Sequence, residues 1–247
     1  MNEGKSRSAV RWAAVIGGIL IAAAIIALYT PWVRIFDLRE IVVRGNYYTS
    51  AAAVKDGSGI QDRVNLLRAP LKQARTLLLQ LPWIMEVSFH RILPHTLEII
   101  VRERNPIALV VDPSNESRLM VLGEDGVIVG YAKDSNLNFM CIGGVAIAST
   151  PSGKRIVSTD VVQMVAYLRK RGLGRDLFPR IDFSNLSAII MYTVDEGEVM
   201  LGPISDIEDR IDELTVLLDT IDLASYQTID LRFGGEARLV PRKVVNR

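Results

Sequence analysis

The sequence predicts an α+β protein with a single N-terminal transmembrane helix, a small β-α-α-β-β module, and a mostly antiparallel β domain that carries two helices. Three observations lead to this prediction. An uncharged, apolar segment occupies residues 12–33. Residues 36–104 show strand and helix patterns in an order that fits one compact unit. Residues 105–240 are rich in strand patterns and contain two amphipathic helical segments.

Composition excludes several classes of protein. The chain has 247 residues, of which 49% are hydrophobic, so it can bury a substantial core. Lys and Arg number 29 against 28 Asp and Glu, and this near-neutral balance lacks the basic footprint of a nucleic-acid binder. One cysteine, Cys141, cannot form an intramolecular disulfide, and two histidines, His90 and His95, do not define a zinc site.

The N-terminal segment predicts a membrane anchor. At 1.5 Å per residue, a helix from Trp12 to Tyr29 spans about 27 Å, close to the roughly 30 Å hydrocarbon core of a bilayer. Trp12 lies at one end and Tyr29 and Trp32 at the other, where aromatic rings favour the headgroup level. Pro31 ends the helix near Thr30. A cleaved signal peptide is the alternative, but its apolar region is usually shorter and is followed by a small-residue cleavage site.

The flanking charges predict the orientation. Three cations and one acid give residues 1–11 a charge of 3 − 1 = +2, namely Lys5, Arg7, Arg11 and Glu3. The positive-inside rule therefore places residues 1–11 in the cytoplasm and the bulk of the chain outside it.

The module at residues 36–104 should contain five elements. We expect a strand at residues 36–44, a short helix capped by Thr49 or Ser50, a helix at 69–81, and strands at 85–90 and 96–102. The first of the last two strands should bury Met85, Val87 and Phe89, and the second should bury Leu97, Ile99 and Val101.

Several short motifs resemble a known family. They are Val43-Arg44-Gly45-Asn46, Leu81-Pro82-Trp83-Ile84, Arg91-Ile92-Leu93-Pro94-His95-Thr96-Leu97, the stretch from Val101 to Ala108, and Ile229-Asp230-Leu231-Arg232-Phe233. In combination, behind one anchor, they resemble the bacterial cell-division family FtsQ/DivIB. The resemblance implies a POTRA domain at residues 36–104. It also implies a C-terminal β domain at 105–240 and a tail at 241–247 that we expect to fray.

The motif residues have a structural interpretation. We expect Trp83 to be largely buried between the helix that ends at Leu81 and the following strand. We expect Pro94 to set a tight connection and Thr96 to favour extended backbone. The complete set to which we assign a structural role is Trp83, Arg91, Pro94, Thr96, Leu97, Glu103 and Pro106.

The second domain is less regular. We expect strands at residues 107–111, 119–122, 127–131, 181–183, 188–194, 198–201, 228–233 and 237–240. One helix should run from the Ser158 cap to about Arg171. The other should begin at Ser205, which with Glu208 fits a capping box, and its apolar stripe is expected to be core: Ile207, Ile211, Leu214, Leu218 and Ile221. Residues 132–157 are hard to interpret, because residues 139–143 lack the proline of the family's motif.

The resemblance also implies function. The family is an inner-membrane scaffold of the divisome at the septum, which links division proteins and regulates septal peptidoglycan synthesis without chemistry of its own. It implies FtsB and FtsL as partners of the C-terminal domain and other division proteins as partners of the POTRA domain. It implies no cofactor, small-molecule substrate or nucleic acid.

The resemblance places the FtsB-binding edge at the final strands: Arg232, Phe233, Gly234, Gly235, Ala237 and Leu239. A strand near the chain end can lie at a sheet edge with unpaired backbone groups. The alternative is that Phe233 closes the core and Arg232 pairs with Asp230. The charges of Glu236 and Arg238 could also serve to prevent strand pairing.

Two other function classes have less support. A POTRA-containing secretion or outer-membrane assembly component should carry a long series of alternating strands of about ten residues. An anchored hydrolase should show a nucleophile elbow, a phosphate loop or a metal set, and the sequence has no such motif.

Overall fold

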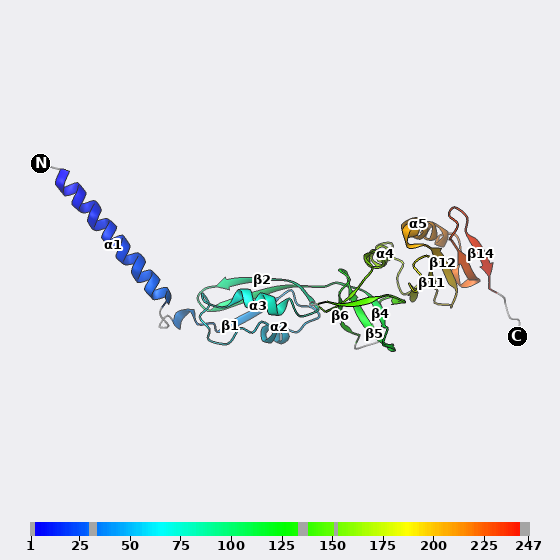
Figure 1. The fold of residues 1–247 in the computed structure, drawn as a ribbon, viewed down its shortest axis with the longest axis horizontal. Coiled ribbons are helices and arrows are strands. Elements are labelled where there is room, and N and C mark those ends of the chain that lie inside the picture. The colour runs from blue at the N-terminus through cyan, green and yellow to red at the C-terminus, as the bar shows by residue number, and fades with distance from the viewer. Residues whose placement is uncertain (1–2, 30–33, 133–137, 151–152, 243–247) are drawn as a thin grey trace. The chain divides into compact units, whose positions relative to one another are not determined.

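The computed structural model describes residues 3–29, 34–132, 138–150 and 153–242 (Figure 1). The chain forms two compact units that are described separately below. The first comprises residues up to Leu78 together with Val87–Val101. The second comprises Leu79–Glu86 and the chain from Arg102 onward.

The N-terminal helix α1 spans Glu3–Tyr29 and includes most of the predicted membrane segment. Trp12 is 68% exposed, and the described apolar side chains of α1, such as Ile16 and Ile26, are exposed as well. The side chain of Tyr29 and the whole of Trp32 lie outside the described residues. Among the residues that the structure describes, no helix combines the length and the apolarity needed to cross a membrane.

The first module confirms the predicted order of strand, helix, helix, strand, strand. A 3-10 turn η1 (Arg34–Phe36) precedes five elements: β1 (Glu40–Arg44), α2 (Ala51–Gly57), α3 (Leu71–Leu78), β2 (Ile84–Ile92) and β3 (Thr96–Glu103). The strand order is β1-β3-β2, with β1 parallel to β3. Parallel strands need a long crossover, and the helical segment between β1 and β2 provides it.

Local signals explain most of these elements. Ser50 caps α2, and its hydroxyl accepts a hydrogen bond of 3.1 Å from the amide of Ala53. In β3, Leu97, Ile99 and Val101 are buried, as their alternation predicts.

Three expectations for this module need correction. The first strand begins at Glu40 and not at residue 36, because residues 34–36 form the 3-10 turn η1. The second helix is shorter than residues 69–81, because Pro82 disfavours helical backbone at Leu81 and the chain turns before it. In β2 the buried residues are Ile84 and Val87, while Met85 and Phe89 are half-buried, so the predicted alternation is only partly right.

The second unit is built on a nine-stranded sheet with the order β14-β13-β12-β11-β10-β7-β4-β5-β6. Five of its eight neighbouring pairs are antiparallel and three are parallel. Its strands are β4 (Pro106–Asp112), β5 (Asn115–Gly123), β6 (Ile128–Tyr131), β7 (Cys141–Gly143), β10 (Arg180–Asp182), β11 (Ile189–Tyr192), β12 (Glu198–Gly202), β13 (Tyr226–Asp230) and β14 (Arg238–Pro241). A separate hairpin pairs β8 (Ile147–Thr150) with β9 (Gly153–Ile156).

Two helices, α4 (Thr159–Lys170) and α5 (Ile207–Leu218), pack on this sheet, α4 against β4 and α5 against β12 (Figure 1). Ser158 caps α4 as predicted, with its hydroxyl accepting from the amide of Val161 at 3.4 Å. The stripe of α5 confirms a core role, because Ile207, Ile211 and Leu214 are buried and the other two residues pack against the same core.

The capping box at the start of α5 is wrong. A 3-10 turn, η2 (Ile204–Asp206), leads into the helix, so its N-cap is Asp206, and no side chain makes a capping hydrogen bond. The Ser205 hydroxyl instead donates to the Asp206 carboxylate at 2.8 Å. A further short turn, η3 (Leu223–Ser225), precedes β13.

Residues 132–157, which were hard to interpret from the sequence, contribute strand β7 to the sheet. Strand β7 pairs in parallel with β4 on one side and with β10 on the other. Cys141 lies in β7 and is half-buried, and burial raises the pKa of its thiol. Residues 133–137 and 151–152 of this segment lie outside the described residues.

Candidate functional site

Strand β14 is one edge of the nine-stranded sheet. It pairs antiparallel with β13, with Ile229 opposite Leu239 and Asp230 opposite Arg238, and no other described strand pairs with it. The opposite edge, β6, is different because the β8–β9 hairpin lies beside the chain that leads into it. There the amide of Ile156 donates to the carbonyl of Gly126 at 2.9 Å. Edge strands with unpaired backbone groups are acceptors for a partner strand.

An exposed aromatic ring precedes this edge strand. Phe233 is 59% exposed, and the guanidinium groups of Arg232 and Arg238 lie 5.5 and 4.8 Å from its ring centroid. Arg232 makes two hydrogen bonds to the Asp230 carboxylate, of 2.9 and 2.7 Å, which lower the pKa of Asp230. Arg232 therefore pairs as the alternative interpretation expected, whereas Phe233 does not close the core.

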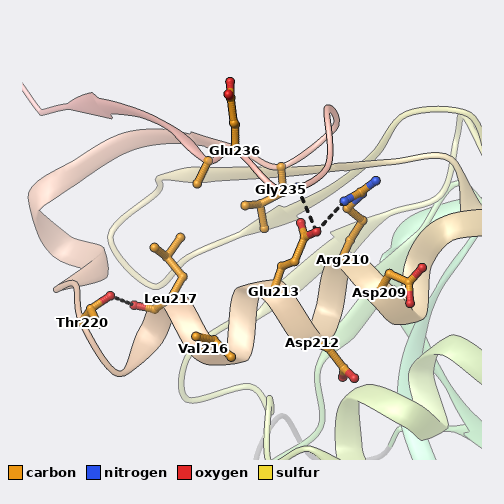
Figure 2. Close-up of a pocket in the computed structure, with 11 residues that line it drawn as sticks. Asp209, Arg210, Asp212, Glu213, Val216, Leu217, Thr220, Gly235 and Glu236 are labelled. Atoms are coloured by element: carbon orange, nitrogen blue, oxygen red, sulfur yellow. Dashed lines mark hydrogen bonds and ion pairs between the residues drawn. The ribbon is translucent and has the colours of Figure 1, made fainter.

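The β13–β14 turn rests on α5. Gly234 and Gly235 have φ of +59° and +74°, a left-handed backbone that favours glycine. A Cβ on Gly234 would lie 2.6 Å from Nη2 of Arg210. The amide of Gly235 donates to Oε1 of Glu213 at 3.1 Å, and Nη1 of Arg210 donates to the same oxygen at 2.7 Å (Figure 2). The hydrogen bond from Gly235 joins the turn to the helix, and Arg210, on the same helix as Glu213, holds the Glu213 carboxylate that accepts it.

Between α5 and this turn lies a groove of about 650 Å³ (Figure 2). Its apolar part includes Leu231, which is buried, and Val216, which is 69% exposed. Its rim is mainly acidic. The residues that line it are Asp209, Arg210, Asp212, Glu213, Val216, Leu217, Thr220, Leu231, Gly235, Glu236 and Ala237.

Two of the acidic side chains of the groove make hydrogen bonds within the protein. Burial opposes ionisation of Glu213, but the hydrogen bonds from Arg210 and Gly235 outweigh it and lower its pKa. Asp212 accepts from the hydroxyl of Tyr167 at 2.8 Å and from Nη2 of Arg171 at 2.7 Å, which joins α5 to α4.

The structure brings the predicted edge residues together and adds α5 to them. Ala237 lines the groove, and Leu239 turns inward and packs against the core. Sequence reasoning missed the contribution of α5. Its one signal was Val216, an apolar residue that lies off the core stripe of that helix.

The family motif residues of the first unit hold its hairpin and loops. Nε of Arg91 donates to the carbonyl of Leu66 at 2.9 Å. The peptide bond before Pro94 is cis, Thr96 begins β3, and Leu97 is fully buried.

Trp83 has a different environment from the expected one. It is half-buried and packs against a cluster of Leu109, Val121 and Val129 in the second unit. The backbone explains this placement, because the carbonyl of Trp83 accepts a hydrogen bond from the amide of Arg104, and both residues belong to the second unit.

Arg104 holds the segment around Trp83 through hydrogen bonds, and sequence reasoning did not single out this arginine. Its Nη1 donates to the carbonyls of Pro82 and Ile84, both at 2.7 Å, and its Nε donates to the Asp125 carboxylate at 2.9 Å. Its backbone amide donates to the carbonyl of Trp83 at 2.8 Å. The proline–tryptophan step and the end of β3 are therefore joined through one side chain.

The remaining motif residues lie next to Arg104. Glu103 ends β3 and is half-buried. Pro106 is buried at the start of β4, and its carbonyl accepts a hydrogen bond from Arg169 of α4.

The described residues include no group of three or more His, Cys, Asp or Glu side chains that could hold a metal ion. Nδ1 of His90 lies 3.6 Å from the Glu98 carboxylate, and His95 lies beside Thr96.

The fold defines a protein that carries a POTRA domain and a β domain whose sheet ends in the edge strand β14. In agreement, residues 36–104 match the family model described as "POTRA domain, FtsQ-type". Among similar proteins, FtsQ of Geotalea daltonii is 23% identical over 248 residues, covering 97% of this chain and 88% of that protein. DivIB of Clostridium acetobutylicum is 25% identical over 208 residues, covering 81% of each.

FtsQ of Corynebacterium glutamicum is 25% identical over 153 residues, which cover 62% of this chain and 65% of that protein, slightly less than two thirds. Residues 36–104 therefore carry an FtsQ-type POTRA domain, and the chain is similar to bacterial cell-division proteins named FtsQ and DivIB.

Proposed function

We propose that this protein is a membrane-anchored scaffold of the divisome. It links division proteins at the septum and helps to regulate septal peptidoglycan synthesis, with no catalysis of its own. The observation that carries the proposal is the open edge of β14 beside the α5 groove, in a chain that is similar to FtsQ and DivIB proteins. The names of its relatives favour this role over a secretion or outer-membrane assembly component.

The proposed partners of this edge are FtsB and FtsL. A segment of the partner adds to β14 as a strand, with backbone hydrogen bonds along the edge. Phe233 supplies an exposed aromatic anchor next to the strand, and Val216 with Ala237 receives an apolar side chain in the groove. Other division proteins contact the POTRA domain.

The proposed anchor is residues 12–33, uncleaved, with residues 1–11 in the cytoplasm and the bulk in the periplasm. Helix α1 supports this proposal because the part of it that lies in the proposed anchor, residues 12–29, is about 27 Å long, close to the roughly 30 Å hydrocarbon core of a bilayer. A reporter that is active only in the periplasm, fused after Arg247, should be active. A mature N-terminus near Thr30 would contradict the anchor.

The partner surface is tested with Phe233→Ala and Val216→Asp in the full chain, measured by binding to the purified FtsB–FtsL complex. Both side chains are exposed, so circular dichroism should be unchanged. Each variant should weaken binding about tenfold or more, the range of an interface anchor. Val194→Ala is the matched control, because Val194 is also 59% exposed but lies in the β11–β12 turn. Unchanged binding in both variants would place the partner surface elsewhere.

A further inference from the structure

A second surface lies on the first unit, at one end of its sheet. It is formed by three segments: residues 34–39, 63–68 and 91–95. Backbone and side-chain hydrogen bonds join them. The amide of Leu66 donates to the carbonyl of Phe36 at 2.7 Å, Nε of Arg91 donates to the carbonyl of Leu66, and the amide of Arg39 donates to the carbonyl of His95 at 2.9 Å. We refer to these three segments as the tip surface.

The tip surface exposes large apolar side chains. Ile92 and Leu93, at the turn of the β2–β3 hairpin, are 50% and 58% exposed, and Ile35 of η1 is 61% exposed. Leu67 adds a fourth such side chain, 37% exposed. All four belong to one compact unit, and the described residues of that unit leave them exposed.

The same segments are strongly basic. They contain five arginines and one acid, Arg34, Arg39, Arg63, Arg68, Arg91 and Asp37, which gives 5 − 1 = +4 with His95 neutral. The whole chain carries +1, so the rest of it carries 1 − 4 = −3. Two acids, Glu40 and Asp62, flank the segments without entering them. Positive charge is therefore concentrated at this end of the unit.

The tip surface is also tethered close to α1. Arg34 follows Tyr29, the last residue of that helix, by five residues, which can span at most about 18 Å. Figure 1 shows the β2–β3 hairpin turn at the end of the unit where η1 enters. If α1 spans the membrane, as proposed above, the tip surface cannot move far from the bilayer.

We infer that the tip surface binds the membrane itself, on the periplasmic leaflet. Ile92 and Leu93 enter the interfacial layer, and the arginines interact with the phosphate groups of anionic phospholipids. Exposed apolar side chains combined with clustered arginines are the features of an interfacial membrane contact, and each cation near an anionic surface adds about 1 kcal/mol. This contact rests on the proposed anchor, and it would orient the POTRA unit relative to the bilayer.

The test uses the full chain, with Cys141→Ala, reconstituted in phosphatidylcholine vesicles with and without phosphatidylglycerol. A fluorophore is attached at Leu93→Cys or, as the matched control, at Ala51→Cys. Ala51 is exposed and begins α2, which follows the opposite end of β1. Lipids that carry a quencher near the headgroup should quench the label at position 93 more than the label at position 51.

The quenching at position 93 should increase with phosphatidylglycerol. Arg34→Gln should lower the equilibrium constant for contact about fivefold, the value of one charge near an anionic surface. Equal quenching at positions 93 and 51, in vesicles that retain the protein, would overturn the membrane contact and leave the anchor intact. Failure of the chain to float with the vesicles after a carbonate wash would overturn the anchor, and the contact with it.

Discussion

Gly45 belongs to the motif Val43-Arg44-Gly45-Asn46, and its backbone geometry explains why a glycine is needed there. It follows β1 with φ of +78°, and a Cβ at this position would lie 2.1 Å from the carbonyl oxygen of Val101 in β3. An ordinary contact between carbon and oxygen is about 3.3 Å or longer, so Gly45→Ala must push β1 and β3 apart by about 1 Å. The neighbour is backbone and cannot rotate away.

Gly172 provides a matched comparison. It has nearly the same φ, +76°, but a Cβ there would have nothing within 4 Å. Gly172→Ala should therefore cost only the left-handed backbone, about 1 kcal/mol. Gly45→Ala adds the cost of overpacking, for a total of about 2–4 kcal/mol.

The measurement is amide hydrogen exchange of the full chain, which reports free energies of opening locally. Gly45→Ala should lower the protection of β1 and β3 and leave the second unit unchanged. Gly172→Ala should change protection slightly, near the end of α4. Equal effects of the two substitutions would refute the argument that the approach of Val101 requires a glycine.

Three other predictions follow from single side chains. Trp83→Ala should lower the free energy of unfolding by about 2 kcal/mol, less than the loss of a fully buried tryptophan, because Trp83 is half-buried. Hydrogen exchange should show the loss of protection in β4–β6, against which Trp83 packs. A loss confined to β1 would contradict the placement of Trp83. Hydrogen bonds from Ser114 lower the pKa of Asp112 to about 2, below the value near 3.9 of an unfolded chain. The stability that this carboxylate contributes is therefore present above about pH 4 and is lost as the pH falls toward 2. The unfolding temperatures of Asp112→Asn and of the parent protein should differ above about pH 4 and should converge between about pH 4 and pH 2. Ser158→Ala should destabilise the protein by about 1 kcal/mol in urea, whereas Ser205→Ala should have almost no effect; equal costs would mean that Ser205 caps α5.

The sequence predicted the elements whose signals are local. The cap at Ser158, the order of strands and helices in the POTRA domain and the core stripe of α5 each depend on neighbouring residues. The failures have non-local causes. Ser205 matches the capping pattern, but a 3-10 turn moves the N-cap by one residue, to Asp206.

The same distinction applies to the candidate site. The pattern at the end of the chain predicted a strand, and sheet order determines that this strand, β14, lies at an edge. The groove could not be predicted, because it forms where the turn at Gly235 meets Glu213, 22 residues earlier in the chain. Pairing across that separation has no signature in one sequence.

The motif residue Arg104 and the proposed partner-binding residue Phe233 lie far apart within the second unit, and this leads to a final prediction. Arg104 binds the carbonyls of Pro82 and Ile84 beside the cluster formed by β4, β5 and β6, while Phe233 adjoins β14 at the other edge of the sheet. Eight strand spacings of about 4.8 Å separate the two edges, roughly 38 Å.

Sites at this separation without shared contacts should act additively on the free energy of binding. Arg104→Lys should lower stability, because an ammonium group cannot reproduce the fork of donors, and should leave affinity for the proposed FtsB–FtsL complex unchanged. The double variant with Phe233→Ala should then bind as weakly as Phe233→Ala alone. A loss of affinity in Arg104→Lys while the fold is intact would mean that the end of β3 takes part in partner binding. The partner surface would then have to extend well beyond β14.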